Sequence, residues 1–227
     1  MSLSELDPPY LAPDYKSTVL RSPGKALVMP PAGMTELTGP KFFVNDIRAS
    51  DSDLTVHGSG EPIGERIIVH GRVTDAYGKP VRNSLLELWQ ANSAGRYIHK
   101  LDTHPAPLDP NFVGAGRTIT DADGNYRFVT IKPGPYPWKN HTNAWRPAHI
   151  HFSLFGRAFT QRLVTQMYFP GDPLFYQDPI FNAVRDERAR QRLVSAYDHA
   201  STVEEWATGY RFDIVLGGNE ATPLEDD

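Results

Sequence analysis

Two histidines, His149 and His151, stand two positions apart in the segment AHIHF. In a β-strand, residues i and i+2 point to the same face, so both imidazoles would share one face while Ile150 enters the core. Neutral imidazole is the commonest metal ligand in proteins. The pair therefore indicates a metal site, although such pairs also occur on surfaces and in structural hydrogen bonds.

Further ligands must come from other residue types, because the chain has no cysteine. That absence excludes disulfides, iron–sulfur clusters, thiolate zinc sites and thiol nucleophiles. Asp121 and Asp123 lie in a turn sequence, where aspartate is favoured for structural reasons. Tyr136, held among prolines in KPGPYPW, and Tyr97, in AGRYIHK after an apolar run, are the better candidates. A single tyrosine is more often a half-buried aromatic, so both depend on the histidine pair.

A phenolate is a hard anionic donor that suits a hard ion such as Fe(III) better than zinc or copper(I). Two phenolates and a bound hydroxide would cancel the three charges of Fe(III), with two neutral imidazoles completing the set. A neutral site of this kind can be buried without the cost of an isolated charge. The residues thus allow a ferric centre with an open position, and a zinc site on the histidine pair stays an alternative.

Short strands separated by turns must position these residues. RTITDADGNYRFVTI predicts a hairpin with its turn at 121–124, and only DERARQRLVSAYDHA, near 186–200, has a helical pattern. Such a pattern favours an all-β sandwich or barrel over βαβ units. The other strand-like segments are RIIVHGRVTD, SLLELWQA, AHIHFSLF, QRLVTQMYF and YRFDIVL.

Residues 1–62 differ from the rest, since they are rich in Pro, Gly and Ser and show no helical period. Scattered apolar residues favour an extended arm that packs on another surface over a floppy tail. We therefore divide the chain into an N-terminal arm, 1–62, and a catalytic β-domain, 63–227. The acidic end PLEDD is interpreted as a solvated tail.

Length and charge exclude several classes of protein. The 227 residues suffice for one large domain, and the net charge of -4 argues against nucleic-acid binding. The sequence has neither an apolar run long enough for a membrane span nor a recognisable signal peptide. We therefore expect a cytoplasmic protein with no nucleic-acid or membrane partner.

Four long segments resemble the intradiol ring-cleaving dioxygenases: GRVTDAYGKPVRNSLLELWQANSAGRYIHK, APLDPNF, TDADGNYRFVTIKPGPYPW and WRPAHIHF. The resemblance extends from about Leu11 to Leu216 and is greatest to the family's iron-bearing β subunits. It implies a β-sandwich of two mainly antiparallel sheets with long loops, the extended arm and one or two short helices. It also implies one Fe(III) per chain, bound by Tyr97, Tyr136, His149 and His151.

The same resemblance assigns roles to residues around the metal. It implies that Tyr136 also acts as a base, that Arg146 steadies charge on the substrate, and that Gln166 lines the active site. The alternative for Gln166 is a buried, hydrogen-bonded structural role. The residues implied in substrate binding are Tyr15 and Arg21, near a ring carboxylate, and the aromatic residues Trp89 and Trp138. Ser17 stands where the family often has threonine, and the hydroxyl is kept.

The implied reaction is cleavage of protocatechuate (3,4-dihydroxybenzoate) by dioxygen to 3-carboxy-cis,cis-muconate, in the β-ketoadipate pathway of aromatic catabolism, without an external reductant. The implied partner is a homologous α subunit in an α/β hetero-oligomer. Three alternatives stay open: an intradiol enzyme acting on catechol, hydroxyquinol or a chlorinated catechol, a non-catalytic β-sandwich subunit, and a zinc hydrolase.

Overall fold

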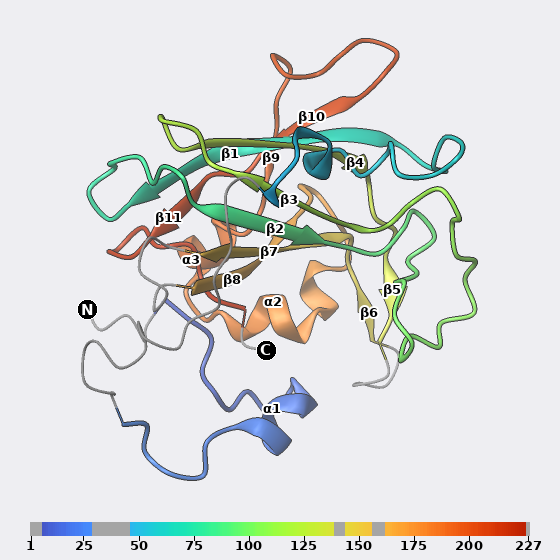
Figure 1. Cartoon of the computed structure of the whole chain (residues 1–227). Helices are drawn as coiled ribbons and strands as arrows, with labels where there is room; N and C mark the ends of the chain where they lie inside the picture. Colours follow the sequence, from blue (N-terminus) through green and yellow to red (C-terminus); the bar gives the residue numbers. More distant parts are fainter. Residues whose placement is uncertain (1–5, 29–45, 139–143, 156–161, 226–227) are drawn as a thin grey trace.

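The computed structural model describes residues 6–28, 46–138, 144–155 and 162–225. Within these residues, strands dominate and the helices are short (Figure 1). The strands are β1 Arg66–Asp75, β2 Leu85–Trp89, β3 Ala115–Ile119, β4 Asn125–Ile131, β5 Tyr136–Pro137, β6 Trp145–Arg146, β7 His149–Phe155, β8 Arg162–Tyr168, β9 Ala196–Tyr197, β10 Thr208–Arg211 and β11 Ile214–Leu216. The helices are α1 Lys16–Arg21, α2 Pro179–Ala183 and α3 Glu187–Gln191, with 3-10 turns η3 Ala49–Ser52 and η4 Phe175–Gln177.

Two sheets form a sandwich, which confirms the predicted fold class. One sheet has the order β11-β1-β10-β9, with β4 also paired to β1, and the other has the order β3-β2-β7-β8. A separate two-stranded sheet joins β5 and β6. Most pairs are antiparallel, whereas β10 and β11 both run parallel to β1. The α2 and α3 helices pack on the outer face of the second sheet, around the buried ring of Tyr168 (Figure 1).

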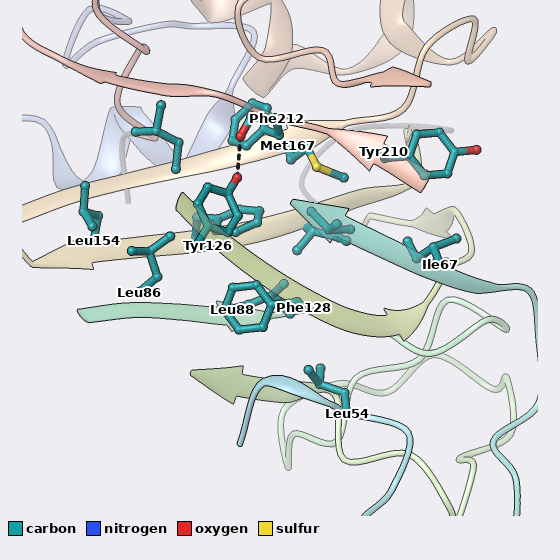
Figure 2. Close-up of a cluster of buried hydrophobic side chains, with 14 of the residues drawn as sticks. Leu54, Ile67, Leu86, Leu88, Tyr126, Phe128, Leu154, Met167, Tyr210 and Phe212 are labelled. Atoms are coloured by element: carbon teal, nitrogen blue, oxygen red, sulfur yellow. Dashed lines mark hydrogen bonds between the residues drawn. The ribbon is translucent and has the colours of Figure 1, made fainter. Parts of the chain in front are cut away.

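The main hydrophobic core lies between the two sheets (Figure 2). Strand alternation sends Phe128 of β4 and Phe152 of β7 into it, with their rings edge-to-face at 6.1 Å between centroids. Leu54, from the predicted arm, is fully buried in the same core, and its N–H donates to the Val129 carbonyl at 2.9 Å. Part of the arm thus packs on the sandwich, and the boundary at residue 62 stays a prediction.

The predicted hairpin is wrong, although its turn is present. Gly124 has a φ of +80°, and its N–H donates to the Asp121 carbonyl at 3.1 Å. The strands on either side then diverge: β3 pairs with β2, and β4 pairs with β1 in the other sheet. The turn therefore links the two layers of the sandwich.

The helix observed in this region, α3, is much shorter than the one predicted near 186–200. Asp186 caps α3 by accepting from the Ala189 N–H, but α3 ends at Gln191. Beyond it, the Tyr168 N–H donates to Leu193 and the Ser195 N–H donates to Tyr168, at 2.8 and 2.9 Å. This pairing with the end of β8 holds the segment extended and overrides its helical pattern.

The region before residue 65 also contains a helix, although its sequence shows no helical period. The α1 helix has only six residues, too few for a hydrophobic period to be visible. Buried Thr18 stabilises it, because its hydroxyl donates to the carbonyls of Ala12 and Tyr15, both at 2.8 Å. Across the described part of the chain, no helix is long and apolar enough to span a bilayer.

Candidate metal centre

The β7 strand places His149 and His151 side by side on the outer face of the second sheet. Their ring centroids are 4.9 Å apart, while Ile150 between them is fully buried in the core, as strand geometry predicts. Register brings further residues to this face: His149 is opposite Tyr168 of β8, and His151 is opposite Gln166.

Tyr97 is presented by a tight loop after β2. Asn92 organises this loop, because its side-chain oxygen accepts from the N–H groups of residues 94 and 96 at 3.0 and 2.9 Å. Gly95, with a φ of +76°, lets the loop lie directly on the segment that bears Tyr136. A Cβ on Gly95 would clash with the Pro135 carbonyl oxygen. Close backbone packing thus joins the two tyrosine-bearing segments.

Tyr136 is placed by the short pairing of β5 with β6, in which it lies opposite Arg146. The Arg146 Nη1 group is 3.4 Å from the Tyr136 hydroxyl, and it donates to His149 Nε2 at 2.9 Å. One guanidinium therefore contacts a candidate phenol ligand and a candidate imidazole ligand.

The four predicted ligands converge. Tyr136 Oη lies 3.3 Å from His149 Nε2, and Tyr97 Oη lies 3.1 Å from His151 Nε2. Donor atoms that share one metal ion with bonds of about 2 Å are separated by about 3 Å, so these spacings fit a metal centre. Among the described residues, no group of three or more His, Cys, Asp and Glu could hold a metal. The candidate centre is not such a group, because two of its four donors are tyrosine phenols.

Both histidines direct Nε2 toward the phenols, because Nδ1 is engaged elsewhere. His149 Nδ1 lies 2.7 Å from the Pro147 carbonyl, and His151 Nδ1 lies 2.8 Å from a Glu225 carboxylate oxygen. A carbonyl or a carboxylate can only accept, so Nδ1 donates and Nε2 carries the lone pair of each ring. At His149 this lone pair accepts from Arg146, so a cation would have to displace the guanidinium from it.

The electrostatics of the cluster favour neutral imidazole but disfavour a free phenolate. Burial, with the positive charge of Arg146 second, lowers the pKa of His149 well below its usual value. Loss of hydration, followed by the neighbouring Tyr136, raises the pKa of the Tyr97 phenol well above its usual value. Tyr97 therefore needs a nearby multiply charged cation to ionise near neutral pH, which suits a trivalent metal.

Arg146 is buried in a polar network behind the histidines. Its Nη2 group donates to Asp178 at 3.0 Å, to Gln166 at 2.5 Å and to the Tyr168 hydroxyl at 3.0 Å. Burial acts to lower the pKa of Arg146, but the negative charge of Asp178 raises it above its usual value. The guanidinium stays charged, and Gln166 contacts the network rather than the ligand oxygens.

A cavity of about 380 Å³ opens beside the phenols, and Trp138 lines its wall with both tyrosines; small-molecule sites often have such volumes. Tyr15 is buried with its ring edge-on to Trp138, at 5.2 Å between centroids, and the Arg21 guanidinium lies 4.8 Å from the Tyr15 ring centroid. Trp89 instead stacks on His151 at 4.9 Å and does not line this cavity.

Three residues of the network were missed in the sequence. Tyr168 shares a strand face with Gln166 two positions earlier, so strand alternation could have identified it. Asp178 is fully buried and caps α2, a signal that appears only with the helix in place. Glu225 belongs to the presumed solvated tail, yet its side chain is only 6% exposed, so that interpretation is wrong for this residue.

Comparison with known proteins places this geometry in a family. Residues 37–218 match the model named "Dioxygenase", and residues 8–32 match the N-terminal model of the protocatechuate 3,4-dioxygenase beta subunit. The beta chain of that enzyme from Burkholderia cepacia is 58% identical over 96% of this chain and 93% of its own length. The alpha chain from Pseudomonas putida is 32% identical over 72% of this chain and 77% of its own length.

Solved structures agree with the sequence relatives. The 3-chlorocatechol 1,2-dioxygenase of Rhodococcus opacus 1CP has a TM-score of 0.55 and 27% identity, covering 75% of this chain and 67% of its own. The catechol 1,2-dioxygenase of Acinetobacter sp. ADP1 has a TM-score of 0.53 at the same identity, covering 75% and 59%. Family models, relatives and fold thus lead to one conclusion: the chain belongs to the intradiol dioxygenases, a family that depends on non-haem iron.

Proposed function

We propose that this chain is the iron-bearing β subunit of a protocatechuate 3,4-dioxygenase, with one Fe(III) per chain. The observation that supports this most directly is the convergence of two phenols and two imidazoles at spacings of 3.1 and 3.3 Å. The near full-length similarity to a protocatechuate 3,4-dioxygenase beta chain supports the choice of substrate. Tyr97, Tyr136, His149 and His151 are the proposed ligands.

Fe(III) bound there would draw electron density from a coordinated catechol and make its ring reactive toward dioxygen, with cleavage of the bond between the two hydroxyl-bearing carbons. The chain's own residues bind the catechol, accept its protons and steady the charge. Tyr136 is the proposed base, because its oxygen belongs to the donor set and the residue also lines the cavity. Arg146, 3.4 Å from that oxygen, would stabilise negative charge as the proton moves.

The carboxylate of the substrate needs a donor and a positive charge as it leaves water. Tyr15, packed edge-on against the cavity residue Trp138, and Arg21 at the Tyr15 ring are the proposed sources. Trp138 would cover one side of the ring. Trp89 and Gln166 would hold other site residues in place rather than contact the substrate, since Trp89 stacks on His151 and Gln166 accepts from Arg146.

An α-type subunit is the proposed partner. The N-terminal segment exposes a row of large apolar side chains in the single chain, which is typical of a surface that another protein covers. These are Tyr10, Leu11, Val19, Leu20, Leu27 and Val28. The similarity to a protocatechuate 3,4-dioxygenase alpha chain shows that related chains form both subunit types. A cytoplasmic location stays a prediction.

The test is a visible absorption spectrum of the concentrated protein, coexpressed with its α-type partner. We expect a broad tyrosinate-to-iron band that shifts when protocatechuate is added without oxygen, and loss of the substrate when air is admitted. Turnover should need no NADH or ascorbate. A protein that stays colourless after iron is supplied would contradict the proposal and would indicate a non-catalytic subunit.

A second candidate function is intradiol cleavage of an uncarboxylated catechol. Relatives named hydroxyquinol 1,2-dioxygenase, from Rhizobium sp., and catechol 1,2-dioxygenase, from Candida albicans, are each 32% identical over 66% of this chain. Rates on catechol, hydroxyquinol and protocatechuate decide between them. We expect Tyr15→Phe and Arg21→Gln to raise the KM for protocatechuate while leaving that for catechol almost unchanged.

A further inference from the structure

The last described segment, residues 221–225, runs back along β8 toward the candidate metal centre. The Thr165 hydroxyl donates to the Pro223 carbonyl at 2.8 Å, and the Glu225 N–H donates to the Val164 carbonyl at 2.6 Å. On its other side, the Leu224 N–H donates to Asp7 at 3.0 Å. The segment is thus fixed to the sheet edge by hydrogen bonds of its backbone to β8 and to Asp7, none of which involves a candidate ligand.

This anchoring delivers the Glu225 side chain to the back of His151. One carboxylate oxygen lies 2.8 Å from His151 Nδ1, and the other accepts from the Gln166 side-chain amide. The carboxylate is 6% exposed and the His151 side chain 11% exposed, so water competes little for either group. A buried carboxylate with a separate donor on each oxygen has a fixed orientation.

Glu225 is also linked to the buried ion pair of the network. Arg146 pairs directly with Asp178 at 3.0 Å, and Gln166 accepts from Arg146 at 2.5 Å while its amide group donates to Glu225. Gln166 thus holds one carboxylate oxygen of Glu225, and the other oxygen faces His151.

We propose that Glu225 is a positioning residue for the metal centre: it fixes His151 in the Nδ1–H form and makes its Nε2 a stronger donor to the iron. The inference rests on the proposed function for the identity of the metal. Metal-bound histidines commonly donate their other N–H to a carboxylate, and loss of such a partner costs about 10- to 100-fold in metal affinity or activity. Here the carboxylate comes from a segment whose anchoring hydrogen bonds, to Val164, Thr165 and Asp7, involve none of the four donors.

The first experiment compares Glu225→Gln with Glu220→Gln in the α-coexpressed protein. Both changes remove one negative charge from the C-terminal part of the chain, but Glu220 precedes the segment, is 80% exposed and pairs with Arg192. His151 and Gln166 face different oxygens of the carboxylate. The amide of E225Q would put an NH2 group, which cannot accept, at one of these two positions. We expect E225Q to bind iron about 10- to 100-fold more weakly in chelator competition, whereas E220Q matches the wild type.

The charge-transfer band separates positioning from a merely structural role. A weaker imidazole donor leaves the iron a better electron acceptor, so the band of E225Q should lie at longer wavelength. If E225Q keeps the band position and iron affinity of E220Q, the inference is wrong. If the wild type itself has no such band, the proposed function fails instead, and the two failures are therefore distinguishable.

A second measurement does not depend on a stable variant. Nitrogen-15 histidine NMR of the metal-free wild-type protein reports which ring nitrogen of His151 bears the proton, with the signal assigned through His151→Gln. We expect Nδ1–H, with the proton shifted far downfield by its carboxylate partner. An Nε2–H imidazole at His151 would overturn the inference even if E225Q failed to fold.

Discussion

Arg146 is one buried residue that joins an ion pair to the candidate metal centre. Its side chain is 3% exposed and that of Asp178 is 0% exposed, and their N–O separation is 3.0 Å. The same guanidinium donates to His149 Nε2 at 2.9 Å. Removing one member of a buried ion pair leaves an uncompensated charge, which costs much more than the pair contributes.

We therefore expect Arg146→Met to lower the free energy of unfolding by about 3–5 kcal/mol, measured in urea. The matched control is Arg117→Met, which breaks the pair with Asp51 at a side chain that is 45% exposed and should cost less than about 1 kcal/mol. The double variant Arg146→Met/Asp178→Asn should recover part of the loss. Equal losses in R146M and R117M would contradict this account.

At the residue scale, the sequence predicts the shared face of the histidine pair, because strand periodicity is a local property. The i, i+2 spacing suffices to place His149 and His151 on one face. The network behind them could not be predicted in the same way. Glu225 reaches His151 across 74 positions, and its role depends on a return path along β8 that no local pattern encodes.

At the scale of elements, two loops without regular structure set the positions of the tyrosines. The Gly134 N–H donates to the Asn92 carbonyl at 2.9 Å, and a Cβ on Gly134 would clash with the Ser93 carbonyl oxygen. Gly95, in turn, lies against the other loop, where an added Cβ would clash with the Pro135 carbonyl oxygen. The spacing of Tyr97 and Tyr136 therefore depends on two glycines that bear no functional group.

We expect Gly95→Ala to weaken iron binding and reduce the tyrosinate-to-iron band, because its Cβ would push the two loops apart. Gly78→Ala is the matched control: Gly78 has the same φ of +76°, but nothing lies within 4 Å of its added Cβ. Both variants should lose about 1–2 kcal/mol of stability to a left-handed alanine, measured in urea. Only G95A should lose iron, and similar iron binding in both variants would refute the loop argument.

The limits of prediction are also visible at this scale. The turn at Asp121–Gly124 is encoded by its residues, whereas the partners of the flanking strands are chosen by the core, which draws β3 and β4 into different sheets. The helical pattern after Asp186 likewise yields to backbone pairing with β8. Local sequence thus predicts where strands and turns occur, and tertiary packing decides which strands pair.

At the scale of the whole molecule, a buried hydrogen bond joins the two segments that flank β1 in the first sheet. The Tyr126 hydroxyl donates to the Phe212 carbonyl at 2.5 Å, across 86 positions (Figure 2). Gly71 of β1 allows this contact, since a Cβ there would clash with the same carbonyl oxygen. Tyr126→Phe should leave that buried acceptor without its partner, at a cost of about 1–3 kcal/mol.

The same bond predicts how stability depends on alkaline pH. Burial raises the pKa of Tyr126 well above its usual value of about 10. The folded chain therefore keeps this proton when the unfolded chain loses it. The contribution of Tyr126 is fully present below about pH 10 and is lost as pH rises, by about 1.4 kcal/mol per pH unit.

Urea unfolding of wild type and Y126F between about pH 8 and pH 11 measures this difference. The gap between the two should be constant up to about pH 10 and should shrink above it, because Y126F has no proton to lose there. Buried Tyr168 titrates alike in both proteins and cancels. Tyr77→Phe, at a side chain that is 94% exposed, should match the wild type throughout. If the difference in free energy of unfolding stays constant to the end of this range, the Tyr126 proton does not contribute to stability as predicted.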